Sequence, residues 1–207
     1  MDGWPVANSS FRSPGFDFTG SMRELGEDMI ARVPALRHID LPVVGLSVAQ
    51  TRKPVRHGLW ASLTPLRFSG GAEVETRRGR PYTCQAVCDR SGRRLLYIMT
   101  FYLPRFVDLS QREKLATFIH ELWHISPECN GDIRRHDGRC YAHTGSQEAY
   151  DAQVELLVDA WLQASPPDHL YEFLQHDFST LCRIHGGVRG SRFPRPKIIP
   201  WTASAGH

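Results

Sequence analysis

Hydrophobic and polar residues change their period along the chain, and the changes predict one helix, then strands, then further helices. In residues 21–34, "SMRELGEDMIARVP", Ser21 and Glu24 have the spacing of a capping box, and Pro34 ends the helix. From residue 41 to residue 104 the chain contains short runs rich in β-branched and aromatic residues, separated by turn sequences such as "SGG" and "DRSG". These runs predict a small, mostly antiparallel sheet.

Helical spacing returns in the second half of the chain. Three further helices are predicted, within residues 109–125, 146–164 and 169–186. Together these patterns predict a single α+β domain over residues 21–187. We expect an irregular arm over residues 1–20, and an extended, basic, proline-rich tail over residues 188–207 that packs near the functional cleft and restricts access to it.

Composition places the chain among globular proteins. It has 207 residues, 41% of them hydrophobic and 23% charged, which suits one compact domain with its own core. The sequence begins without an apolar run of signal-peptide length, and no segment approaches the length of a membrane span. Five cysteines, an odd number, favour reduced thiols. We therefore expect a cytoplasmic protein without a membrane partner, of undetermined oligomeric state.

The positive charge is distributed unevenly. The net charge is only +3, yet no acidic residue follows Asp177, and "RRGR" at residues 77–80 is followed by Arg93 and Arg94. The basic residues after Asp177 are Arg183, Arg189, Arg192, Arg195 and Lys197. A solvated surface is the simplest interpretation of such runs, and binding to nucleic acid is the alternative.

One predicted helix carries two histidines on a polar face. Ser110 and Glu113 have capping-box spacing, so this helix begins near residue 111, and Pro127 ends it. At about 100° per residue, His120 and His124 project together, one turn apart. The opposite face carries the apolar side chains Leu115, Phe118, Ile119 and Leu122.

These histidines belong to the pattern H-E-x-x-H. Neutral imidazoles at positions i and i+4 bind Zn²⁺, so His120 and His124 are candidate metal ligands. Glu121 lies beside them, where its carboxylate can take a proton from a zinc-polarised water, and is the candidate general base. Tyr141 and Tyr150 are candidates for a hydrogen bond to the oxyanion of a tetrahedral intermediate. No other cofactor site is indicated.

The segment "HELWHISPECNGDIRRHDGRCYAH", residues 120–143, resembles the HExxH zinc metallopeptidases, or zincins. It is most similar to the predicted phage-type and bacterial metallopeptidases whose motif reads HEL-x-HI followed by a proline, a glycine turn and a later histidine. The resemblance covers residues 95–161 and implies a zincin-like fold, a zinc ion and hydrolysis of peptide bonds. It also implies an edge strand that pairs with extended substrate, for which residues 93–104 are the candidate.

A catalytic zinc site normally has three protein ligands, so a third ligand is required. Residues 131–143 resemble a hairpin-like excursion with His136 at its tip and His143 at its base. We prefer His143 because the base lies nearer the motif helix, and His136 is the alternative. Glu148 and Glu155, on the next helix, are further candidates.

The sequence therefore predicts a zinc-dependent peptidase acting on a peptide or protein. One alternative is a nucleic-acid-associated zinc protease, similar in concept to SprT-like proteases, in which the basic segments contact DNA. Another is a non-catalytic zinc-binding module that keeps the zincin frame and uses the cleft to hold a partner.

Overall fold

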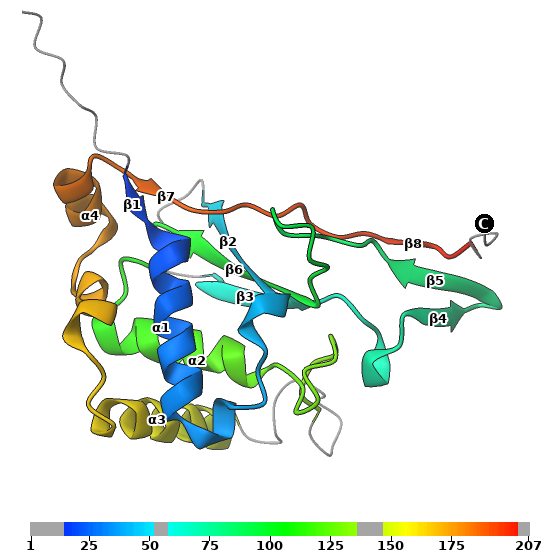
Figure 1. Cartoon of the computed structure of the whole chain (residues 1–207), viewed down its shortest axis with the longest axis horizontal. Helices are drawn as coiled ribbons and strands as arrows, with labels where there is room; N and C mark the ends of the chain where they lie inside the picture. Colours follow the sequence, from blue (N-terminus) through cyan, green and yellow to red (C-terminus); the bar gives the residue numbers. More distant parts are fainter. Residues whose placement is uncertain (1–14, 52–57, 136–146, 203–207) are drawn as a thin grey trace, which may run out of the picture.

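The computed structural model describes residues 15–51, 58–135 and 147–202, and this part of the chain is a mixed α+β fold (Figure 1). Its elements are four α-helices and three small sheets, with short 3-10 turns between them. None of the described helices is long and apolar enough to cross a membrane. The α+β class predicted from the sequence is confirmed.

The central sheet contains strands β2 (Val44–Gln50), β6 (Tyr97–Leu103) and β3 (Ala61–Pro65), in the order β2-β6-β3. Strand β3 pairs antiparallel with β6, but β2 pairs parallel with it. The predicted mostly antiparallel sheet is therefore wrong for this layer, which is mixed. In the structure, Val44–Val48 are all buried, and continuous burial of this kind is typical of parallel strands.

Helices cover one face of this sheet. Helix α1 (Phe18–Arg32) packs against β2, while α2 (Gln111–Trp123) packs against β3 and against α3 (Gln147–Gln163). Aromatic rings join the layers: the Phe101 ring on β6 lies 5.3 Å from the Phe18 ring and 5.7 Å from the Phe118 ring. The core therefore fixes α2, the helix with the H-E-x-x-H pattern, against both the sheet and α3.

The first helix begins earlier than predicted. Its N-cap is Asp17, whose Oδ1 accepts a hydrogen bond from the backbone N–H of Gly20 at 3.1 Å, so Ser21 lies inside the helix. Residues Phe16–Asp17 form the short strand β1, so the expected irregular arm ends before residue 16. A carboxylate is as good a cap as a hydroxyl, which is why the two candidates were hard to rank from the sequence.

The last predicted helix is interrupted. Only Phe178–His185 form an α-helix, α4, and two 3-10 turns, Asp168–Leu170 and Glu172–Gln175, precede it. The buried amine of Lys114 donates to the carbonyls of Leu174 and His176, both at 2.8 Å. Burial lowers the pKa of Lys114 to about 8. A long-range lysine contact of this kind leaves no trace in local periodicity.

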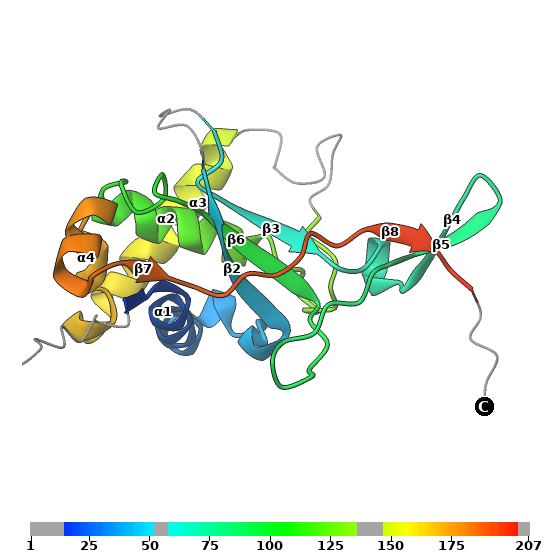
Figure 2. The ribbon, with the colours of Figure 1, turned by 90° about the horizontal axis from the view of Figure 1, so that it is seen from above.

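The tail runs along the body and then away from it (Figure 2). Strand β7 (Val188–Arg189) pairs in parallel with β1. Further on, the Ser191 carbonyl accepts a hydrogen bond from the Val48 N–H at 2.9 Å. Near its described end the tail forms β8 (Ile198–Pro200), the outer strand of a third sheet ordered β4-β5-β8, with β4 at Val74–Arg77 and β5 at Arg80–Cys84.

Candidate metal centre

The helix that carries the candidate ligands is capped as predicted. Ser110 Oγ accepts from the N–H of Glu113 at 3.3 Å, and Glu113 Oε2 accepts from the N–H of Ser110 at 2.8 Å, which completes a capping box. The helix ends at Trp123, and His124 is its C-cap. The predicted apolar face is confirmed as buried core: Leu115, Phe118, Ile119 and Leu122.

The two motif histidines converge. Their Nε2 atoms lie 3.0 Å apart, and the planes of their rings are nearly perpendicular, at 82°. Two nitrogens bound to one tetrahedral zinc at about 2.0–2.1 Å would be separated by roughly 3.3 Å. At 3.0 Å the pair can share either a proton or a metal ion. The donor set therefore fits two of the ligands of a zinc site.

Tyr150 holds the orientation of His124 from the neighbouring helix. Its hydroxyl lies 3.2 Å from His124 Nδ1 and donates to the carbonyl of His120 at 3.4 Å. Because the phenol proton points to that carbonyl, the phenol oxygen can accept the Nδ1–H of His124, which leaves the Nε2 lone pair facing His120. Burial raises the pKa of Tyr150, so the phenol stays neutral.

The sequence suggested Tyr150 only as a donor to an oxyanion. The structure instead directs its hydroxyl to His124 and to the backbone of His120. A partner of this kind fixes the tautomer of a metal-binding imidazole. Because the contact joins two helices and crosses 26 residues, no sequence spacing could have indicated it. The other candidate, Tyr141, lies outside the described residues.

Glu121 lies in the same pocket as His120. The pocket has a volume of about 480 Å³ and is lined by residues of α2, α3 and the segment entering β3: Gly58, Leu59, Trp60, Ala61, Ala116, Thr117, His120, Glu121, Asp151, Val154 and Glu155. The Glu121 side chain is largely buried, and this burial raises its pKa to about 7, although a hydrogen bond from the Leu63 backbone opposes the shift. The carboxylate therefore lies beside His120 and holds a proton more readily than an exposed glutamate does.

The expected substrate strand is not an edge strand. Residues 97–103 form β6, which is paired on both sides by β2 and β3, so this prediction is wrong. The apolar strand β6 lies at the centre of the sheet because its side chains are buried most completely there. Strand β3 has only one strand neighbour among the described residues, and Ala61 at its start lines the pocket. The tail was expected near this pocket, yet none of its described residues lines it.

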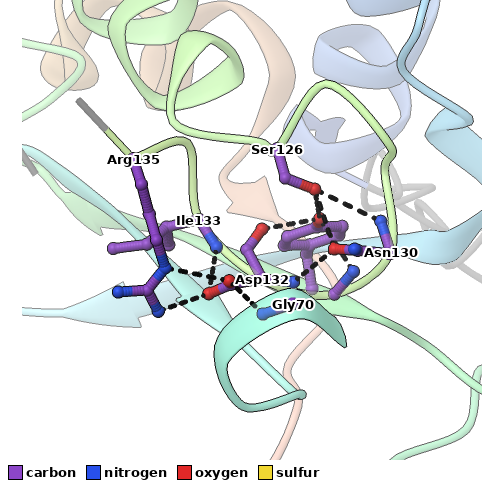
Figure 3. A network of polar contacts seen from close by, with 8 residues as sticks. Gly70, Ser126, Asn130, Asp132, Ile133 and Arg135 are labelled. Atoms are coloured by element: carbon purple, nitrogen blue, oxygen red, sulfur yellow. Dashed lines mark hydrogen bonds and ion pairs between the residues drawn. The ribbon is translucent and has the colours of Figure 1, made fainter. Parts of the chain in front are cut away.

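The chain beyond His124 turns back on itself. Ile125 and Ile133 form an isolated antiparallel bridge. Between them, Asp132 accepts hydrogen bonds from the backbone of Gly70 and of Ile133, both at 2.8 Å, and pairs with Arg135 at 2.9 Å (Figure 3). This network fixes the described end of the loop that leads to the later histidines.

The proposed third ligands can be located only in part. His136 and His143 lie outside the described residues, as does the side chain of Glu148. Glu155 lines the pocket, but its carboxylate pairs with Arg112 at 2.6 Å. Among the residues that the structure describes, no group of three His, Cys, Asp or Glu side chains could hold a metal.

Asp151 was not singled out from the sequence. It lies one helical turn before Glu155 on α3 and lines the pocket with His120 and Glu121. The i,i+4 spacing of the two carboxylates was a usable signal, because it puts both on one face of the predicted helix.

Comparisons with known proteins give no family for this chain. No family model matches it, and neither a curated protein nor a solved structure matches it. The functional argument therefore rests on the residues and their geometry.

Proposed function

We propose that this protein is a zinc-dependent peptidase of the zincin type. His120 and His124 bind the zinc with a third ligand, for which His143 is preferred and His136 is the alternative. Glu121 is the general base. The observation that carries the proposal is the convergence of two imidazole Nε2 atoms, 3.0 Å apart, where one of the two histidines, His120, lines a pocket together with the buried Glu121.

The chemistry follows from the environment of Glu121. Bound zinc would lower the pKa of a coordinated water to about 7 and polarise the substrate carbonyl. As general base, Glu121 would accept a proton from the attacking water, and its protonated form would give that proton to the departing amine. Burial makes a proton more favourable on this side chain than on an exposed glutamate, which suits both steps.

The substrate would be an extended segment of a peptide or protein. An extended chain can add to the outer edge of β3 through backbone hydrogen bonds, beside the pocket that contains Glu121. Leu59 and Trp60, just before β3, are 61% and 39% exposed and line the same pocket. Their exposed apolar surface favours apolar side chains in the substrate. The four described cysteines are free thiols, which supports a cytoplasmic site of action.

The proposal is tested by metal analysis of the purified protein, followed by incubation with a peptide library. We expect one zinc per chain and cleavage that stops when a chelator removes the zinc. Protein without zinc would contradict the proposal. Stoichiometric zinc without cleavage of any peptide would identify a non-catalytic zinc-binding module.

The third ligand is tested by two substitutions. His143→Ala should weaken zinc binding by several kcal/mol, since the total for a complete zinc site is on the order of 10 kcal/mol. His136→Ala should change it little. A titration against a competing chelator measures both, with Glu155→Gln as the control for a glutamate ligand. Loss of zinc in His136→Ala alone would reverse the assignment.

Tyr150→Phe removes the hydroxyl that holds His124 and keeps the buried ring. Loss of a hydrogen-bond partner behind a ligand typically lowers metal affinity by about 10- to 100-fold. We expect a loss in that range, measured by chelator competition. Tyr171→Phe is the matched control, because its hydroxyl bonds to Asp168 on the surface. Equal affinity in the two variants would remove Tyr150 from the site.

A further inference from the structure

Positive charge is concentrated in two segments of the chain. Residues 72–94 and 189–202 hold ten Lys and Arg against three Asp and Glu, a net charge of +7. The whole chain carries only +3, so the remaining residues are net −4. The two basic segments lie about a hundred residues apart in the sequence. Neither segment alone therefore indicates their combined net charge.

Strand pairing brings the two segments together. Strand β8 lies alongside β5, where the Lys197 carbonyl accepts from the Gln85 N–H at 2.8 Å, and the Trp201 N–H donates to the Pro81 carbonyl at 3.0 Å. The β4-β5-β8 sheet extends away from the helices, at the opposite end of the molecule from α4 (Figures 1 and 2). We call residues 74–84 and 197–201 the basic arm.

Arginines occupy the tip of the basic arm. Arg77 and Arg80 are paired across the hairpin, and the turn between them is made by Arg78 and Gly79, whose φ values are 50° and 74°. Positive φ at both turn residues is typical of the tight turn that continues the twist of a two-stranded ribbon. The tip is therefore a narrow ribbon that presents three arginines within four residues.

Most of the arm's cations are not neutralised by the protein. Arg77 pairs with Glu75, but no described residue forms an ion pair with Arg78, Arg80 or Lys197, and all three are exposed. Ile198 and Ile199 are 49% and 40% exposed, and since consecutive strand residues point to opposite faces, neither face of β8 is covered. Trp201 is also 42% exposed. This surface matches a partner that has both regular negative charge and apolar surface.

We propose that the basic arm binds duplex DNA, with the hairpin tip in a groove and the flanking cations on phosphates. The major groove of B-form DNA admits a two-stranded β-ribbon, whereas the deep, narrow major groove of an RNA helix does not. Arg78 and Arg80 lie at the ribbon tip, and Lys197, just before β8 at the base of the arm, would meet the phosphate backbone. The exposed Trp201 packs against sugars or base edges. This binding does not depend on the peptidase activity.

Fluorescence anisotropy of the full-length protein with a labelled mixed-sequence duplex tests the proposal over a range of salt concentrations. The logarithm of the affinity should fall linearly with the logarithm of the salt concentration, by about 0.9 per phosphate contact. Each of Arg78→Gln, Arg80→Gln and Lys197→Gln should reduce this slope by about 0.9. Arg183→Gln, an equal change of charge on the exposed surface of α4, should leave it unchanged.

Three results would overturn the proposal. One is the absence of binding at low salt. Another is an equal reduction of the salt-dependence slope in Arg183→Gln, which would show that the slope depends only on net charge. The third is binding of a single strand, or of polyglutamate in a competition, at least as tight as that of the duplex. Unchanged melting temperatures of the arm variants ensure that any loss reflects the contact and not the fold.

Discussion

Glu121→Gln should lower the rate of peptide hydrolysis by at least about 10²- to 10⁴-fold, the usual contribution of a general base. Glutamine has the size of glutamate, and its amide oxygen can still accept the hydrogen bond from the Leu63 backbone. It cannot accept a proton from water. The measurement is the initial rate of cleavage of the best peptide from a library, at equal zinc occupancy.

The variant should still contain zinc, because both imidazoles remain in place. Metal analysis of the Glu121→Gln protein therefore separates a lost base from a lost ion. Glu172→Gln, a substitution of the same kind at an exposed position, is the control and should keep full activity. Hydrolysis by Glu121→Gln at the original rate would exclude the mechanism.

His120→Ala and His124→Ala should each lose the metal. Removing one ligand from a zinc site should cost at least about 3 kcal/mol, more than a hundredfold in affinity. Zinc should raise the melting temperature of the original protein, because it binds the folded state, and it should have no such effect on either variant. The measurement is a thermal melt with and without added zinc.

Both variants should still fold, since the large apolar core around Phe101 and Phe118 does not include the two imidazoles. His169→Ala, at an exposed position outside the pocket, is the matched control and should respond to zinc as the original protein does. A zinc-dependent rise in the melting temperature of His120→Ala or His124→Ala would remove that residue from the ligand set.

The candidate helix was predictable from the sequence because all its determinants are local. The Ser110–Glu113 capping box, the apolar face and the one-turn spacing of His120 and His124 are features of neighbouring residues. The same holds for the helix stripe Val154, Leu157, Val158 and Trp161, whose helical spacing is visible in the sequence and whose side chains are all buried.

Features that depend on distant contacts were missed. The direction of β2 depends on the path of the chain through β3, β4 and β5, and hydrophobic alternation carries no information on direction. The break before α4 depends on a lysine from α2, and the role of Tyr150 depends on the packing of α3 on α2. The position of a strand within the sheet could not be predicted either. An apolar strand can lie at the centre or at an edge, and β6 lies at the centre.

The pairing of β1 with β7 joins Phe16 to Val188, so the first described strand pairs with the last strand but one. During synthesis on the ribosome, α1, α2 and the central sheet emerge before β7 and β8 can reach them. Until then the N–H of Val48 lacks its acceptor on Ser191, and the β5 edge that later pairs with β8 is open. Non-local pairing of this kind slows folding and leaves strand edges exposed to other chains. The nascent protein is therefore most vulnerable to aggregation just before its last strands emerge, which makes this the stage at which a chaperone would protect it.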